Sequence, residues 1–237
     1  MRLTVRGNCL GSTVGERKMR LMPIPLTIEL LKEEAGAFAE RESKHDAPEL
    51  YGVTDGKRIG TYLEHKLWAH LDTKYTYKEG SSAGGLDFPG LKVDLKITSL
   101  KQPQSSCPFR SARQKIYGLG YGLLIFVYDK SDNDEANTGR LTIEQTVFVE
   151  AARTADFQTT SGLRMILDNQ GNLDDIMAYF ADRNLPLDEI QSRILAEEVL
   201  KHPPEIGYLT ISNALQWRLQ YSRVIQQAGA VEGVDDL

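Results

Sequence analysis

The chain has 237 residues, of which 41% are hydrophobic and 26% are charged, a composition typical of a globular protein. The longest apolar run, GLLIFVY, is too short to span a membrane, and the basic N-terminal stretch lacks the continuous apolar segment of a secretory signal. The only two cysteines, Cys9 and Cys107, are too few for a disulfide framework. We therefore expect a cytoplasmic protein.

The net charge of −5 argues mildly against nucleic acid as a partner, but the charge is unevenly distributed. Between Gly90 and Gly120 lie six cations against a single anion, Asp94. Acidic residues are concentrated elsewhere, in residues 31–49 and at the C-terminus. A local basic strip is compatible with a polyanionic partner, although chance clustering produces the same pattern.

Hydrophobic spacing predicts two helices in the first third of the chain. The first lies within residues 23–44, with a proline near its start. The second runs from about Gly60 to Thr73, and its apolar residues form one stripe. The Gly- and Ser-rich residues 78–85 then predict a loop.

Three strands are predicted next. Residues 93–99 alternate apolar with polar residues, so that Asp94 and Lys96 would share one face. A long polar connection leads to residues 122–130, which read as a buried central strand followed by an exposed turn. Residues 140–152 are the third strand.

From about Asp156 the pattern predicts helices only, the last of them starting at Thr210 or Ser212. The expected fold class is α/β (α+β), a mixed sheet with helices before it and a helical C-terminal part. We expect two regions: residues 1–155 as the core with its N-terminal helices, and residues 156–237 as a helical region. The last two helices resemble a helix-turn-helix or winged-helix element that contacts DNA.

The strand at residues 93–99 carries the groups that hydrolysis of a phosphodiester requires. Asp87 and Asp94 could hold Mg²⁺ through oxygen atoms, with the Leu95 carbonyl as a further ligand. Lys96 could orient the attacking water and offset developing charge. A turn at Pro89 and Gly90 would bring Asp87 alongside.

The acid–any–lysine triplet is by itself weak evidence, because this chain contains it six times. Five copies lie on predicted helices or polar loops, where they read as solvated surface. Only the copy at Asp94 alternates with apolar residues, follows a second aspartate and precedes a buried strand. The alternative is a half-buried strand with a solvated charged face.

The sequence LDFPGLKVDLKITS followed by GLLIFVYDK resembles the signature of the PD-(D/E)XK phosphodiesterase superfamily. Its members include type II restriction endonucleases and the methyl-directed mismatch-repair nicking endonuclease. In the latter, an aspartate precedes the acid of the acid–any–lysine triplet at the same spacing as Asp87 precedes Asp94. A helical glutamate of the family is matched by Glu64 in GTYLEHKL. The resemblance covers about residues 58–129 and departs from the pattern at Leu86, where the motif has proline.

This resemblance implies a restriction-endonuclease-like core, a mixed four- or five-stranded sheet flanked by helices. It also implies a Mg²⁺ requirement and cleavage of DNA to 5′-phosphate ends. Asp87, Asp94 and Glu64 would then serve the metal, with Glu64 assisting the metal or the water, and Lys96 would position the water.

Two segments supply candidate DNA contacts, because Arg and Lys suit phosphates and guanine, and Gln suits adenine. In the polar connection the candidates are Lys101, Gln104, Arg110, Arg113, Gln114 and Lys115. On the expected C-terminal helix they are Arg218, Tyr221 and Arg223. The alternatives are a wet polar face for the first segment and simple core packing for the second, and Cys107 is expected to be a small buried residue.

The sequence is therefore interpreted as a Mg²⁺-dependent type II restriction endonuclease acting on double-stranded DNA. A cognate DNA methyltransferase encoded nearby would be its functional partner, and a homodimer and a monomer both remain open. Three alternatives stay open as well: a repair or recombination endonuclease (a mismatch-repair nickase or junction resolvase), a non-catalytic DNA-binding regulator, and a purely structural α/β protein.

Overall fold

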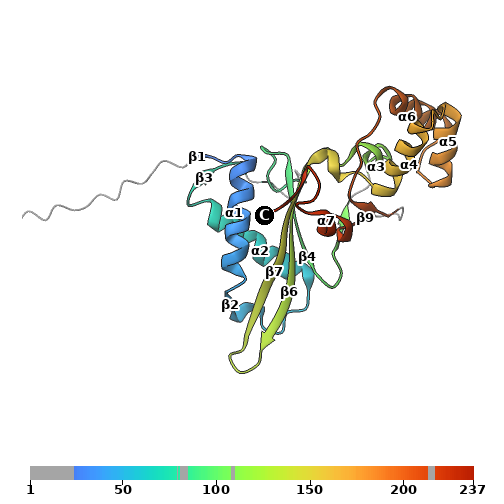
Figure 1. Cartoon of the computed structure of the whole chain (residues 1–237). Coiled ribbons are helices and arrows are strands. Elements are labelled where there is room, and N and C mark those ends of the chain that lie inside the picture. The colour runs from blue at the N-terminus through green and yellow to red at the C-terminus, as the bar shows by residue number, and fades with distance from the viewer. Residues whose placement is uncertain (1–23, 79, 81–84, 108–109, 213–216) are drawn as a thin grey trace, which may run out of the picture.

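A computed structural model describes residues 24–78, 80, 85–107, 110–212 and 217–237 (Figure 1). The basic N-terminal segment, Cys9 and most of the predicted loop at residues 78–85 lie outside the described residues. Within the described ranges no helix is long and apolar enough to cross a membrane.

The centre of the molecule is a mixed five-stranded sheet, as predicted. Strand β4 (Val93–Ser99) runs parallel to β6 (Gly122–Asn133), which pairs antiparallel with β7 (Thr138–Val149). Strand β7 also pairs antiparallel with β10 (Val234–Asp236) and with the short β2 (Asp46–Ala47). In the order β10-β7-β6-β4, strand β4 lies at one end of the sheet, so one of its edges is left for other contacts.

Strand β6 is buried on both faces, as its continuous apolar sequence predicted. Leu124 and Phe126 belong to a core cluster that includes the first two helices, whereas Leu123, Ile125 and Val127 belong to a second cluster with the C-terminal elements. Because neighbouring side chains point to opposite faces, one strand anchors two cores.

Helices α1 (Ile28–Glu42) and α2 (Gly56–Leu71) cover the first face, on the left in Figure 1. Each begins at a side-chain cap, Thr27 for α1 and Asp55 for α2, which accepts a hydrogen bond from a free backbone N–H of the first turn. Both predicted helices are therefore confirmed. A short parallel pair, β1 (Ile24–Pro25) and β3 (Tyr75–Thr76), lies beside them.

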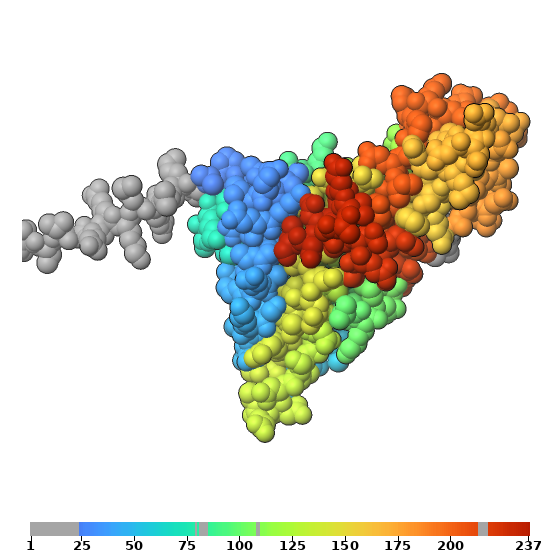
Figure 2. All heavy atoms as spheres, viewed as in Figure 1, coloured from blue at the N-terminus to red at the C-terminus, as the bar shows by residue number. Residues whose placement is uncertain are grey.

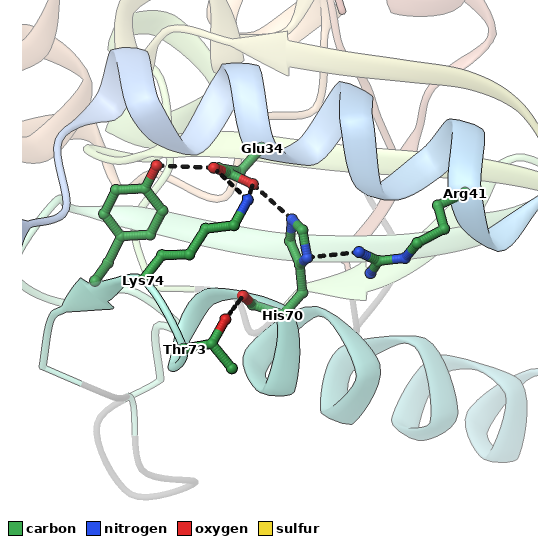
Figure 3. Close-up of polar contacts among 6 residues, drawn as sticks. Glu34, Arg41, His70, Thr73 and Lys74 are labelled. Atoms are coloured by element: carbon green, nitrogen blue, oxygen red, sulfur yellow. Dashed lines mark hydrogen bonds and ion pairs between the residues drawn. The ribbon is translucent and has the colours of Figure 1, made fainter. Parts of the chain in front are cut away.

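A polar cluster joins α1 to the end of α2 (Figure 3). The Glu34 carboxylate accepts hydrogen bonds from Lys74 Nζ at 2.7 and 2.9 Å, from Tyr75 Oη at 2.8 Å and from His70 Nε2 at 2.6 Å. The Arg41 guanidinium can only donate, so His70 Nδ1 accepts its bond of 2.8 Å, and Nε2 carries the proton. The cluster thus holds a neutral histidine between a carboxylate and a guanidinium.

The predicted helices after Asp156 are confirmed as α4 (Phe157–Asp168), α5 (Leu173–Asp182) and α6 (Glu189–Lys201). They share a hydrophobic core with residues of the short α3 (Arg113–Tyr117). In Figure 2 the orange helices form a lobe beside the main body. Two turns of 3-10 helix lie at Pro48–Leu50 and Ala151–Thr154.

The prediction of an all-helical C-terminal third is wrong. The segment expected to form one long helix contains β8 (Thr210–Ile211), β9 (Trp217–Gln220) and the short α7 (Ser222–Gln227), with residues 213–216 outside the described chain. Strand β9 pairs with β8 and with β5 (Gln104–Cys107) in the polar connection. The sequence QWRLQY alternates polar with large apolar residues, a strand period that outweighed the helical spacing around it.

Candidate active site

The predicted catalytic residues meet in one pocket of about 580 Å³ between α2 and β4. Asp87, Asp94 and Lys96 line it together with Leu95, and Glu64 of α2 lines the opposite wall. Four of these residues lie within residues 87–96, and the fifth comes from a helix that packs in the same core as the sheet. The structure therefore brings together every residue that the sequence predicted for the chemistry.

A tight hairpin places Asp87 against the outer edge of β4. Phe88 and Val93 exchange two backbone hydrogen bonds, of 3.0 and 3.2 Å, around the turn at Pro89 and Gly90. The Asp87 carboxylate then accepts a bond of 2.7 Å from the Leu95 N–H. This is the bend that the sequence predicted.

The same bond shows where the Leu95 carbonyl points. The N–H and C=O of one strand residue point to the same side of the strand, and the Leu95 N–H points to Asp87 rather than to β6. The Leu95 carbonyl therefore also faces the free edge of β4, on the side of Asp87.

Asp94 is buried, with 6% of its surface exposed, and Lys96 Nζ lies 2.6 Å from its Oδ2 atom. Their contact follows from strand periodicity, which puts residues i and i+2 on one face. Burial raises the pKa of Asp94; Lys96 opposes this shift, but the hydrogen bond and the negative charge of Asp87 add to it. Two carboxyl groups thus share a site in which one lysine only partly compensates their charge.

Glu64 belongs to the same electrostatic environment. Burial raises the pKa of Glu64, and the charge of Asp87 raises it further, against smaller opposite effects of His65 and Lys96. A carboxyl group with a raised pKa beside other acids in a pocket is typical of a functional site.

The donor set of this pocket suits Mg²⁺. Within the described ranges no three His, Cys, Asp or Glu side chains lie close enough together to hold a metal ion by themselves. Two carboxylates and a backbone carbonyl are nevertheless the hard oxygen ligands that Mg²⁺ takes while it keeps several waters. A cation would also relieve the repulsion that raises the pKa of Asp94.

Lys101, Gln104 and Arg110, among the predicted DNA contacts of the polar connection, are at least partly exposed. Lys101 has 80% of its side chain exposed, with only a long ion pair of 3.7 Å to Asp129. Gln104 is half-buried on β5. Arg110 is exposed, and its Nη2 would lie 3.5 Å from a Cβ added at Gly85, a residue that lines the active pocket. Arg110 therefore reaches the rim of the pocket.

The neighbouring candidates have structural partners instead. The Arg113 guanidinium binds the Glu198 carboxylate, with Nη2–Oε1 at 2.5 Å, and so ties α3 to α6. Gln114 donates a bond of 3.2 Å to the Leu119 carbonyl. Lys115 is only 2% exposed, and burial lowers the pKa of its ammonium. Arg113 is still exposed while it binds Glu198, Gln114 is half-buried, and Lys115 is removed from the wet polar face that the sequence suggested.

The candidates Arg218, Tyr221 and Arg223 do not share a helix face, because the predicted helix is absent. Arg218 is exposed on β9. Tyr221 is completely buried and its hydroxyl lies 2.5 Å from Ser105 Oγ, while the Arg223 guanidinium stacks 3.7 Å from the Phe157 ring. The expected recognition helix is thus corrected to one exposed strand residue and two packed side chains.

The sequence interpretation missed part of the α2 wall. Lys57, Thr61 and Trp68 line the same pocket as Glu64. They lie at helical spacing from Glu64, three to seven residues away, so the period of the helix was the signal that could have found them.

The chain matches the model of the family described as "Type II restriction enzyme NspV" over residues 25–236. The type II restriction enzyme NspV of Nostoc sp. (strain ATCC 29411 / PCC 7524) is 60% identical over 209 residues, which cover 88% of this chain and 95% of that enzyme. A crystal structure of the tetrameric restriction endonuclease SfiI bound to cognate DNA is 9% identical, covers 88% of this chain and 83% of its own, and aligns with a TM-score of 0.36. By its sequence, this chain belongs to the type II restriction enzyme NspV family, and the type II restriction endonuclease predicted from its residues is confirmed.

Proposed function

We propose that this restriction endonuclease requires Mg²⁺ and hydrolyses double-stranded DNA at a specific sequence to leave 5′-phosphate ends, with its chemistry at the free edge of β4. The observation that carries the proposal is the meeting of Asp87, Asp94 and Lys96 around the outward-facing Leu95 carbonyl. Asp87, Asp94 and the Leu95 carbonyl would hold the metal, and Glu64 would assist the metal or its water.

The residues of the pocket would have different roles in the hydrolysis. Mg²⁺, when bound, polarises the scissile phosphate and lowers the pKa of a water. Lys96 lies beside Asp94 and can donate a hydrogen bond to the attacking water, which fixes its direction. The same ammonium offsets the negative charge that develops on the phosphate. Asp87 also holds the Leu95 N–H, so it keeps the edge of β4 aligned with the hairpin.

The remaining assignments concern the DNA and the assembly. Lys101 and Arg110 are exposed cations, Arg110 at the rim of the pocket, and both would contact phosphates. Residues 1–155 would hold the catalytic machinery, and residues 156–237 would add DNA contacts through the exposed Arg218. A homodimer would cut both strands, with a methyltransferase encoded nearby to protect the host sites.

Substitution of the pocket residues tests this proposal. Asp94→Ala and Lys96→Ala should each reduce Mg²⁺-dependent cleavage of plasmid DNA roughly 10²–10³-fold or more, because each removes a group that stabilises the transition state. The matched control is Asp168→Ala, an exposed acid on α4, which should cut at the wild-type rate.

Two further readouts separate a catalytic loss from a folding defect. Both variants should melt cooperatively and should still bind DNA in a gel-shift assay without metal. Sequencing of the cleaved ends should show one recognition sequence with 5′-phosphates. If Asp94→Ala or Lys96→Ala cleaved DNA at the wild-type rate, the assigned site would be refuted.

A further inference from the structure

The small antiparallel sheet β5-β9-β8 has one buried face and one polar face. Its register pairs Gln104 with Gln220 and Ser106 with Arg218, and Thr210 lies across from Gln220 on the other side. Directly paired residues of an antiparallel sheet project to the same face, and so do residues two apart on one strand. These five side chains therefore share one face.

The other face of this sheet belongs to the core. Leu219, Ile211 and Cys107 are buried in the cluster that includes β6, and Ser105 bonds the buried Tyr221 hydroxyl. The burial alternates as the register requires: Ser106, Arg218 and Gln220 are exposed, and Gln104 and Thr210 are half-buried. Three strands thus support a polar surface, which we call the polar face (Thr210, Gln104, Gln220, Ser106 and Arg218).

The chemistry of the polar face matches the edges of bases. Its two glutamines lie opposite each other, and an amide can accept and donate to the N6 and N7 positions of adenine. The guanidinium of Arg218 can donate two bonds to O6 and N7 of guanine. Among the described residues no carboxylate forms an ion pair with Arg218, and no acid lies on the polar face to repel DNA.

The polar face is also joined to the catalytic strand by a short, well-held connection. Strand β5 begins five residues after the end of β4, and the Thr98 hydroxyl of β4 accepts a bond of 3.0 Å from the Gln104 N–H. The Tyr221 N–H bonds the Pro103 carbonyl at 2.9 Å, which fixes β9 to the same connection. The sheet therefore has a defined position relative to the metal-binding edge.

We propose that the polar face of β5-β9-β8 enters the major groove and reads the recognition sequence, with Gln104 and Gln220 contacting A·T pairs and Arg218 contacting a G·C pair. A strand pair is narrow enough for the major groove of B-DNA, and side chains on a sheet are better fixed than those on a loop. The proposal rests on the DNA cleavage activity alone and is independent of which residues bind the metal.

The test compares discrimination rather than rate. The wild-type recognition sequence is first obtained by cleaving a randomised DNA pool and sequencing the ends. The relative kcat/KM is then measured on that site and on every site that differs from it by one base pair, for Gln104→Ala, Gln220→Ala and Arg218→Ala. Each glutamine variant should lose roughly 10- to 100-fold discrimination at A·T positions, and the arginine variant should lose it at a G·C position, with the other positions unchanged.

Matched exposed residues outside the face serve as controls. Gln170→Ala and Arg193→Ala, on the α4–α6 lobe, should leave the profile of discrimination unchanged. Thermal melting of all five variants checks that they fold, which surface substitutions should permit.

The proposal fails if the three variants of the polar face cleave cognate and altered sites with the wild-type ratio, whether their absolute rates fall or not. A uniform fall would indicate phosphate contacts instead. Failure of the metal-site assignment would appear separately, as cleavage by Asp94→Ala, and would leave this measurement valid.

Discussion

Helix α2 takes part in different ways in two of the buried carboxylate clusters of the described chain. Helix α2 contributes Glu64 to the pocket at β4 and, six residues later, His70 to the cluster around Glu34. In the pocket burial raises the pKa of Asp94, Lys96 opposes this shift only in part, and the neighbouring Asp87 adds to it. Around Glu34 burial also raises the carboxyl pKa, but Lys74, Tyr75 and His70 outweigh it, and the net pKa is lowered.

The difference distinguishes a cluster suited to binding a cation from a cluster that only stabilises the fold. At Glu34 nearly every lone pair has a donor, so the ionised carboxylate joins α1 to the end of α2 without needing a ligand. At Asp94 the negative charge is left partly uncompensated, at a cost in stability that a cation can recover. The net direction of the pKa shift therefore distinguishes the proposed metal site from the cluster around Glu34.

The largest expected effect is that of Asp94→Asn on activity. Cleavage should fall roughly 10³-fold, because the amide is a poor metal ligand. The metal-free protein should become more stable, by about 1 kcal/mol, because the raised pKa means that ionisation of Asp94 opposes folding. Urea unfolding in EDTA measures the second effect, and a loss of stability would contradict the comparison.

Glu34→Gln should lower the stability of the protein and leave its activity unchanged. The amide cannot replace the ion pair with Lys74 or the charge-assisted bonds from Tyr75 and His70, so the free energy of unfolding should fall by roughly 2 kcal/mol. Cleavage per folded molecule should stay at the wild-type value. A large loss of kcat at full folding would mean that the cluster takes part in the chemistry.

The third effect is the response of stability to metal. Mg²⁺ at about ten times its dissociation constant should stabilise the wild type by about 1.4 kcal/mol, by binding the folded state only. Glu34→Gln should gain the same increment, and Asp94→Asn little of it. Differential scanning calorimetry with and without Mg²⁺ makes this comparison without DNA, and an equal gain in Asp94→Asn would place the metal elsewhere.

The smallest effect is the pH dependence of the Glu34 cluster. Because the folded-state pKa of Glu34 lies below its ordinary value of 4.5, its contribution is fully present above that pH and is lost as the pH falls through the folded value. The difference in unfolding free energy between the wild type and Glu34→Gln should therefore be constant near neutrality and shrink below about pH 4.5. A difference that grows in acid would mean that the folded-state pKa of Glu34 is raised rather than lowered.

Local sequence patterns were enough to predict the central sheet, most of the helices and the grouping of Asp87, Asp94 and Lys96. These features depend on local periodicity: alternation in β4, a continuous apolar run in β6 and helical spacing in α2, α4, α5 and α6. The hairpin that carries Asp87 is equally local, since its turn joins residues only five apart.

The C-terminal sheet and the surroundings of the basic residues in the polar connection depend on contacts between distant segments. Strand β9 exists because it pairs with β5, more than a hundred residues earlier, and no local signal reports such a partner. In the same way Arg113 is held by Glu198, and Lys115 is buried by the packing of α3. A basic residue shows its charge in the sequence, but whether that charge faces solvent, an acid or the core depends on the distant segments that fold against it.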